Sequence, residues 1–375
     1  MASGWRLRRP ALPTLGEAAA SGFVGSVRGI APLSCLLMLG LLLQLPLARA
    51  APLALQAWAT AEVLFLGWYR FHLAQLQPPA IGPPMTKAQR QQAFARALAA
   101  TSDLRRFVSG WFKLAPFSAI RTGNAKEWLA WAVFGSRLEA LGAAEQQEVV
   151  GMLGAFEAAL GAKLPAGYNP SLREGCIRIN LDPISAQHRP VISYVVTYTA
   201  HAVGWALLRR QGFRRSRCGA LCYWHRPASE PAAKPGRPIV LLHGIGLGLV
   251  PYLGLLDRLI TAHGAACPIL LPEFPHISQK IGGPPPPAPE TCRAIRAMLC
   301  RHCPASRPDA SGDPQPRPAC FVGHSFGSIV CSWLVRLQPD CVASLLFLDP
   351  VTLMLQARHP NPTSLASGLP HSPDG

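Results

Sequence analysis

The chain has 375 residues, of which 36 are lysine or arginine and 19 are acidic, giving a formal net charge of +17. This length has room for two domains. No basic stripe with interleaved aromatic residues accompanies the positive charge, so the sequence argues against nucleic acid as a partner. The 11 cysteines lack the paired spacing of a zinc site, and we expect neither a metal nor a cofactor.

Two apolar stretches follow a basic N-terminal tail, which we place at residues 1–29. Residues 31–48 and 50–69 each approach the roughly 20 residues that a bilayer-spanning helix needs. Arginines before and after the pair predict a transmembrane hairpin within residues 30–77, with both ends on the cytoplasmic side. Glu62 argues against a second full span. A cleaved signal peptide followed by a buried helix is the alternative.

A helical region is expected at residues 78–220. It opens on a proline-rich boundary, and a helical pattern then runs from Thr86 to about Lys163. Within this region, residues 191–208 are apolar, rich in aromatic residues and followed by arginines. This combination is typical of a helix at a membrane interface. A helix that spanned the membrane here would instead place the rest of the chain on the opposite side.

From residue 221 the pattern changes to alternating strands and helices, which predicts an α/β domain over 221–351. Continuous apolar runs such as 238–242 are typical of parallel strands covered on both faces. We expect strands at 221–225, 238–243, 267–272, 319–323 and 344–349, and helices at 247–263, 290–303 and 326–337. Residues 352–375 are rich in proline, serine and glycine and are expected to form a disordered tail.

The strongest motif is Gly323-His324-Ser325-Phe326-Gly327, between a predicted strand and a predicted helix. It fits the G-x-S-x-G nucleophile elbow, a sharp turn that exposes a serine above a sheet. A Cβ atom at Gly323 or Gly327 would crowd the neighbouring strand and helix. Ordinary strand-loop-helix turns also match this short pattern, so its context has to decide.

The sequence around this motif, over residues 237–351, resembles the α/β-hydrolase superfamily. It is most similar to membrane-anchored eukaryotic members with a helical N-terminal extension. The matching segments are PIVLLHGIG at 238–246, LPEFPH at 271–276, GHSFGS at 323–328 and LLFLDPV at 345–351. The resemblance implies a parallel sheet flanked by helices. It also implies a membrane-associated serine hydrolase that cleaves small-molecule carboxylic esters or lipids through an acyl-enzyme on Ser325.

The resemblance further implies an oxyanion hole, built from the loop after one central strand and from the residue after the nucleophile. Ile245 and Phe326 are the candidate N–H donors, with Gly244 and Gly246 shaping the loop. A dinucleotide site is the competing interpretation of these glycines, but the G-x-G-x-x-G spacing is missing.

In this fold the acid and then the histidine follow the serine in the chain. Asp349 is the candidate acid, although it also fits a turn cap. The histidines after Ser325 are His359 and His371, both in the expected tail. We therefore expect the triad and the domain to be incomplete in this chain, through truncation or through loss of catalysis. A noncatalytic binding or scaffold protein is the alternative function.

Two further residues lie past the end of the strand at 267–272. Glu273 and His276 could line a substrate site there or play a structural role. The sequence leaves the substrate and the organelle open, while the apolar stretches predict a membrane location.

Overall fold

A computed structural model of the chain describes residues 15–79, 84–172, 175–229, 236–264, 266–281, 285–305, 312 and 314–351. These residues form two compact units, one made of the residues before 72 and after 186, the other of residues 72–186. The expected C-terminal tail, with His359 and His371, lies outside the described residues, as do the first 14 residues.

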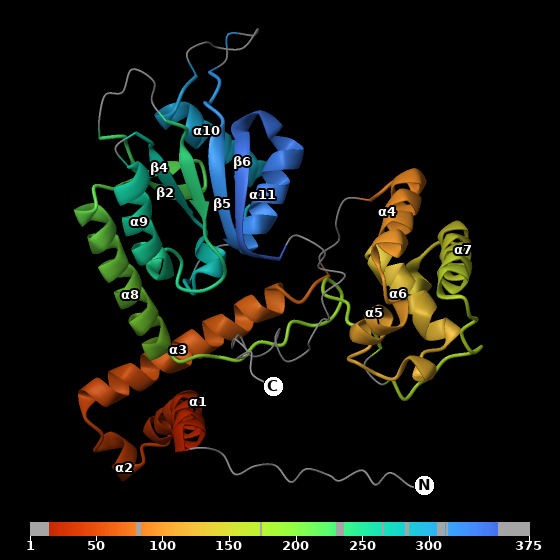
Figure 1. Ribbon diagram of the computed structural model, residues 1–375. Helices are drawn as coiled ribbons and strands as arrows, with labels where there is room; N and C mark the ends of the chain where they lie inside the picture. The colour runs from red at the N-terminus through yellow and green to blue at the C-terminus, as the bar shows by residue number, and fades with distance from the viewer. Residues whose placement is uncertain are drawn as a thin grey trace. The chain divides into compact units, whose positions relative to one another are not determined.

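The first unit is built on a mixed six-stranded sheet (Figure 1). Its strands are β1 (Arg214–Cys218), β2 (Leu221–Arg226), β3 (Ile239–Leu242), β4 (Ile269–Glu273), β5 (Ala319–Ser325) and β6 (Val342–Pro350). They lie in the order β1-β2-β4-β3-β5-β6. The last four run parallel, while β2 is antiparallel to both β1 and β4. The sequence did not predict β1, because this arginine-rich edge strand carries no apolar alternation.

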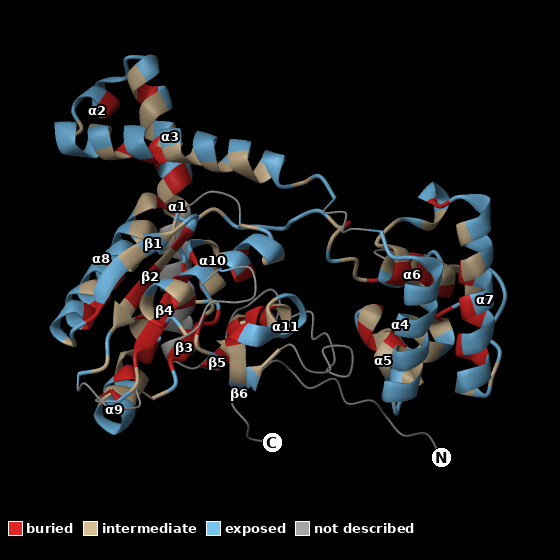
Figure 2. Ribbon diagram, turned by 90° about the horizontal axis from the view of Figure 1, so that it is seen from above, coloured by how far each residue is buried: buried red, intermediate tan, exposed pale blue. Residues whose placement is uncertain are grey.

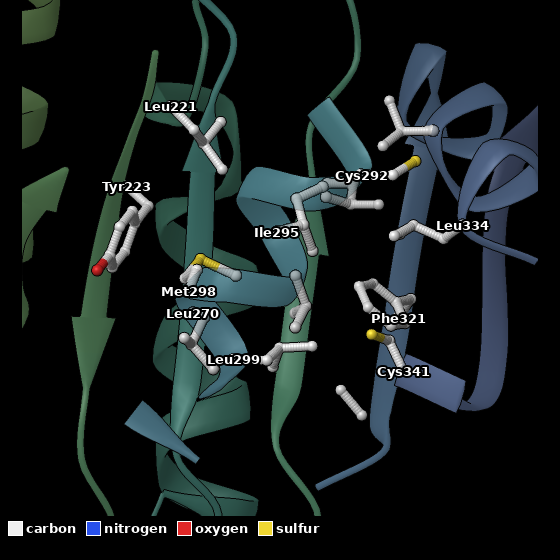
Figure 3. Close-up of a cluster of buried hydrophobic side chains, with 14 of the residues drawn as sticks. Leu221, Tyr223, Leu270, Cys292, Ile295, Met298, Leu299, Phe321, Leu334 and Cys341 are labelled. Carbon is white, nitrogen blue, oxygen red and sulfur yellow. The ribbon is translucent and has the colours of Figure 1, made fainter. Parts of the chain in front are cut away.

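Helices cover both faces of this sheet. Helices α8 (Val191–Arg210) and α9 (Leu253–His263) pack on one face, and α10 (Ala288–His302) and α11 (Phe326–Leu337) on the other. Each face of the sheet has its own hydrophobic core, the first under α8 and α9 and the second under α10 and α11. Side chains of β3 alternate between them, so Leu241 packs in the first core and Val240 in the second. Figure 3 shows the second core, with Ile295 of α10 and Phe321 of β5. The predicted α/β fold, a sheet flanked by helices, is therefore confirmed, with a mixed rather than purely parallel sheet.

Three N-terminal helices precede the sheet: α1 (Leu15–Leu42), α2 (Pro46–Arg49) and α3 (Leu53–Gln75). Much of their apolar surface is exposed (Figure 2), and Leu36 and Leu64 are examples. Glu62 of α3 is fully buried, and its two carboxylate oxygens lie 2.9 and 3.2 Å from the backbone N of Val191, whose N–H they accept. This carboxylate therefore satisfies an N–H at the start of α8, which explains an acid within an apolar helix.

Helix α8 is the membrane-compatible helix of this structure. Within the part of the chain that the structure describes, it is the one helix long and apolar enough to cross a membrane, judged by length and composition. Neither segment of the predicted hairpin, 31–48 or 50–69, meets the same test there, so a multi-pass topology is not supported.

The second unit is helical: α4 (Lys87–Ala100), α5 (Leu104–Trp111), α6 (Thr122–Phe134) and α7 (Ala143–Leu160). Thr86 begins α4 with a capping box, in which Gln89 N donates to Thr86 Oγ1 and Thr86 N donates to Gln89 Oε1. The buried residues of this helical unit form one core that includes Trp128 and Phe156. A core position for Trp128 agrees with the commonest use of such a residue.

Candidate active site

Ser325 lies at the tip of a strained strand-to-helix turn. It is the last residue of β5, and α11 begins at Phe326. Its backbone angles are φ 49° and ψ −116°, a conformation that costs a non-glycine residue energy and persists where the surroundings enforce it. A nucleophile elbow requires such a turn.

The glycines on either side allow the surrounding elements to approach closely. A Cβ atom on Gly327 would overlap the carbonyl oxygen of Leu242 in β3. A Cβ atom on Gly323 would lie 2.8 Å from the Cys331 Sγ of α11. Larger residues would therefore push β3, β5 and α11 apart, and these contacts supply the steric reason for the two glycines.

The loop after β3, called the Gly244 loop below, lies directly against Ser325. A Cβ atom on Gly244 would stand 2.8 Å from both Ser325 Cβ and His324 Nδ1. Gly246 N donates to Ile277 O at 2.9 Å, which joins the loop to the segment after β4. As the first residue of α11, Phe326 has an N–H without an acceptor inside the helix. The structure thus brings the Gly244 loop to the elbow, while donation from Ile245 and Phe326 to a substrate stays a prediction.

Tyr252 connects the same loop to the elbow, a role that the sequence did not reveal. Its hydroxyl oxygen accepts the Gly244 N–H at 2.8 Å and also forms a hydrogen bond with His324 Nδ1 at 2.6 Å. This contact occupies one ring nitrogen of His324. The partners lie 8 and 72 residues apart in the chain, so no local pattern could have indicated the contact.

Ser328 ties the elbow to the end of β6. Its buried hydroxyl donates to Ser325 O at 2.6 Å and accepts the Val351 N–H at 3.0 Å. Asp349 lies nearby in the register of the sheet: His324 pairs with Leu348 and Ser325 with Pro350, so Asp349 is the extra residue of a bulge. The structure therefore brings Asp349 to the same sheet edge as Ser325, and its role as the acid stays a prediction.

His243 stabilises the Gly244 loop from inside the core through two hydrogen bonds. It is fully buried, its Nε2 accepts the Phe274 N–H at 3.0 Å, and its Nδ1–H donates to Gly244 O at 2.9 Å. Burial is the largest cause that lowers the pKa of His243, to about 4. The imidazole is thus neutral at pH 7, which its acceptance of the Phe274 N–H at Nε2 requires.

Acidification is expected to destabilise this unit through His243. An unfolded chain protonates this histidine below its usual pKa of 6.5, while the folded chain resists down to about 4. The contribution is complete above pH 6.5 and decreases as the pH falls, by about 2 kcal/mol at pH 5. Denaturant unfolding at several pH values checks this, with His243→Asn as the non-titrating control. An equal pH dependence in both proteins would contradict it.

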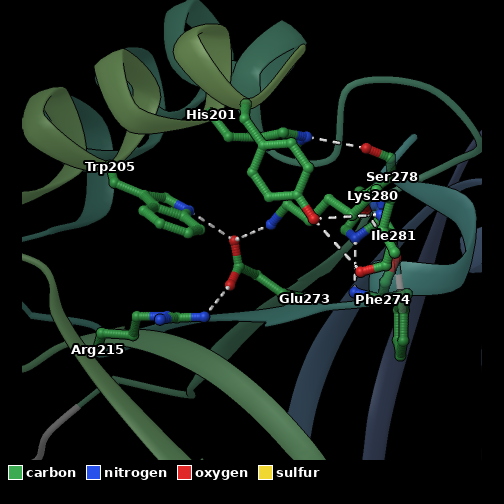
Figure 4. A network of polar contacts seen from close by, with 10 residues as sticks. His201, Trp205, Arg215, Glu273, Phe274, Ser278, Lys280 and Ile281 are labelled. Atoms are coloured by element: carbon green, nitrogen blue, oxygen red, sulfur yellow. Dashed lines mark hydrogen bonds and ion pairs between the residues drawn. The ribbon is translucent and has the colours of Figure 1, made fainter. Parts of the chain in front are cut away.

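Glu273, the last residue of β4, is the centre of a buried polar network (Figure 4). Its Oε1 accepts from Trp205 Nε1 at 2.9 Å and lies 3.5 Å from Lys280 Nζ, while Oε2 lies 3.3 Å from an Arg215 nitrogen. Burial raises the pKa of Glu273, but Lys280, Trp205 and Arg215 together outweigh it and lower the pKa overall. The carboxylate therefore holds α8, β1 and the segment after β4 together, which is a structural role.

Replacing Glu273 by alanine is expected to destabilise the first unit by about 3 kcal/mol, because Lys280, with a side chain 9% exposed, would stay buried without its counter-charge. Hydrogen exchange of peptides covering β3 and β4 across a denaturant series measures this. Glu290→Gln, at an exposed acid in α10, should shift the midpoint little. A loss below about 1 kcal/mol for Glu273→Ala would contradict the prediction.

His276, which follows β4 in the short 3-10 helix Pro275–Ile277, lies beside the elbow. Its ring centroid is 6.0 Å from that of Phe326 in a T-shaped contact. Burial lowers the pKa of His276. Among the described residues, no group of three or more His, Cys, Asp or Glu side chains is placed to hold a metal ion.

Comparison with known proteins adds little to this geometry. The chain matches no protein-family model and no curated protein. Solved structures with some similarity include a bacterial membrane phospholipase A (16% identity, TM-score 0.29, 42% of this chain and 47% of the other). A second example is an epoxide hydrolase (16% identity, TM-score 0.29, 42% of this chain and 49% of the other). A third is the N-formylmaleamic acid deformylase of Pseudomonas putida (15% identity, TM-score 0.27, 37% of this chain and 46% of the other). The chain thus spans less than half of each of these enzymes.

Proposed function

We propose that this protein is a membrane-associated serine hydrolase that cleaves carboxylic esters with lipid-like groups. The observation that carries the proposal is the strained backbone of Ser325, held against the Gly244 loop. Acyl transfer requires a nucleophilic hydroxyl beside backbone N–H donors, and in this proposal Ser325 and the Gly244 loop supply them.

In this mechanism the Ser325 oxygen attacks the ester carbonyl and its proton passes to a histidine. The N–H groups of Ile245 and Phe326 stabilise the oxyanion. Collapse of the tetrahedral intermediate expels the alcohol, which takes up that proton, and water then releases the acid from the acyl-enzyme. Asp349 is the proposed acid that orients the base, and His359 is the first histidine to test as that base.

Labelling with a fluorophosphonate probe tests the proposal. Because the sequence predicts an incomplete triad, strong reaction of the full chain at Ser325, expressed in membranes and identified by mass spectrometry of the modified peptide, requires that His359 or His371 supplies the base. Ser325→Ala should not react there. His359→Ala and His371→Ala should show which histidine activates the serine. A protein whose sheet is protected from hydrogen exchange but which does not react would favour a noncatalytic binding or scaffold protein instead.

Support for membrane association comes from the outer face of α8. Ile192, Val196 and Val203 are exposed on it, while His201 and Leu208 on the opposite face are buried in the unit. Arginines at the C-terminal end of α8 suit lipid phosphates. We therefore propose that α8 lies at the membrane surface beside the exposed leucines of α1 and α3.

The full chain is expected to stay with membranes after both high-salt and alkaline washes, because the exposed apolar surface of α1, α3 and α8 gains by burial in lipid. Sedimentation followed by immunoblotting measures this. The salt wash is the informative control for a chain with a net charge of +17. Release by salt alone would show that the attachment is electrostatic and that the apolar faces do not enter the bilayer.

A further inference from the structure

Two stacked histidines join the C-terminal end of α10 to the antiparallel hairpin of β1 and β2. The rings of His225 in β2 and His302 in α10 have centroids 3.9 Å apart and an interplanar angle of 27°. Both residues are half-buried, and α10 packs against both strands of the hairpin. The reaction proposed at Ser325 uses neither histidine.

Hydroxyl groups of the hairpin hold both rings in place. The Tyr223 hydroxyl forms a hydrogen bond with His302 Nε2 at 2.9 Å, and Tyr223 itself is fully buried. The Ser216 hydroxyl lies 3.4 Å from His225 Nδ1. Because Ser216 pairs with Tyr223 in the register of the hairpin, both hydroxyls lie on the face of the sheet that α10 covers. The fold thus fixes the two imidazoles face to face at the end of the helix.

The surroundings of this histidine pair are positively charged. Arg214 of β1 pairs with His225 in the register, and Arg301 precedes His302 in α10. Among the residues that the structure describes, no carboxylate forms an ion pair with either arginine or either histidine. The other side chains beside the pair from β1, β2 and β4 are hydroxyl, thiol or apolar groups: Ser216, Cys218, Tyr223 and Leu270. A proton on either ring would therefore add positive charge to a site that already has two positive neighbours.

Protonation of both rings is disfavoured while the helix is packed on the hairpin. Burial is the largest cause that lowers the pKa of His302, to about 4, and His225 and Arg301 lower it further. Burial also lowers the pKa of His225, and Arg214 adds to this effect. When the end of α10 separates from the hairpin, each ring regains water and its usual pKa of 6.5. The separated state therefore binds protons that the packed state does not, and its population rises as the pH falls below 6.5.

We propose that the His225–His302 pair is an acid-sensitive contact, whose protonation separates the C-terminal end of α10 from the β1–β2 hairpin while β3, β4 and β5 stay paired. The opposite face of β1 connects this change to α8, because Arg215 lies over the Trp205 ring at 4.6 Å and forms an ion pair with Glu273. Acid would thus loosen the edge strand that holds the proposed membrane-surface helix. The inference does not depend on the reaction at Ser325.

Hydrogen exchange of the full chain in detergent micelles tests the proposal. Between pH 7.5 and pH 5, after correction for the intrinsic exchange rate, protection of peptides covering β1, β2 and the end of α10 should fall at least about tenfold. At pH 5 these peptides should exchange at least about tenfold faster than those of β3 and β5, which open only with the whole unit. Exchange at the imidazole C2 positions, measured by mass spectrometry, should show that both histidines titrate below pH 6.5.

Three variants make the test specific. The double variant His225→Phe with His302→Phe keeps two stacked rings that cannot be protonated, and the fall in hairpin protection should shrink to less than about threefold. Arg214→Gln removes a positive charge at an exposed position, so it should raise the pKa of His225 and make the fall smaller than in the parent protein. His263→Asn is the matched control, because His263 also ends a helix, α9, but is exposed; it should leave the fall unchanged.

Each of three outcomes would overturn the proposal. The first is equal exchange of the hairpin peptides and the β3 and β5 peptides at pH 5, since opening would then involve the whole unit. The second is an undiminished fall in the double variant, and the third is an equal loss of the fall in His263→Asn. If the double variant does not protect β3 and β5 at pH 7.5, Arg214→Gln and the imidazole titration of the parent protein still decide. Titration of both histidines at or above pH 6.5 in the parent would contradict the proposal.

Discussion

Ester hydrolysis is expected to fall by at least about 10⁴-fold when Ser325 is replaced by alanine, since removal of the nucleophile leaves only the contribution of binding and of the oxyanion donors. The structure gives a physical reason to expect so large a loss. The backbone of Ser325 is strained, with φ at 49°, and in the proposed mechanism this turn projects the hydroxyl toward the substrate.

The measurement compares turnover of a short-chain ester by the parent protein and by Ser325→Ala. Ser332→Ala, on α11 outside the motif, is the matched control and should be fully active. Equal residual activity in Ser325→Ala and the parent would show that any hydrolysis arises elsewhere in the chain.

Gly244→Val is expected to lower turnover by about 100- to 1,000-fold, the range found when one oxyanion donor is lost. Gly244 has no space for a side chain, because a Cβ atom would stand 2.8 Å from both Ser325 Cβ and His324 Nδ1. The loop would have to move away from the serine, and the Ile245 N–H would move with it. The hydrogen bond from Gly244 N to Tyr252 would also be disturbed.

Ile245→Ala is the informative control for this prediction. The Ile245 side chain is 72% exposed, so its truncation leaves the backbone N–H in place and should change turnover only slightly. Hydrogen exchange of β3 and β5 peptides should show that Gly244→Val retains the sheet. Full activity in Gly244→Val would exclude this loop from the site.

The parallel core and the elbow could be predicted from the sequence, because local signals encode both. Continuous apolar runs predicted β3, β4 and β5, and the glycine spacing around Ser325 predicted the strand-to-helix turn. The helical pattern that begins at Thr86 likewise predicted the helical unit, and the structure adds the capping box at Thr86. These features depend on residues within one or two turns of each other.

The residues that support the site could be identified only from the folded chain. His243 contacts Phe274 across 31 residues, Tyr252 contacts His324 across 72, and Trp205 contacts Glu273 across 68. Each pair joins separate elements, so no periodicity of the sequence could predict it. The same reason explains Glu62: an acid in an apolar helix argued against a membrane span, and the fold shows that it binds the N-terminus of α8 instead, 129 residues away.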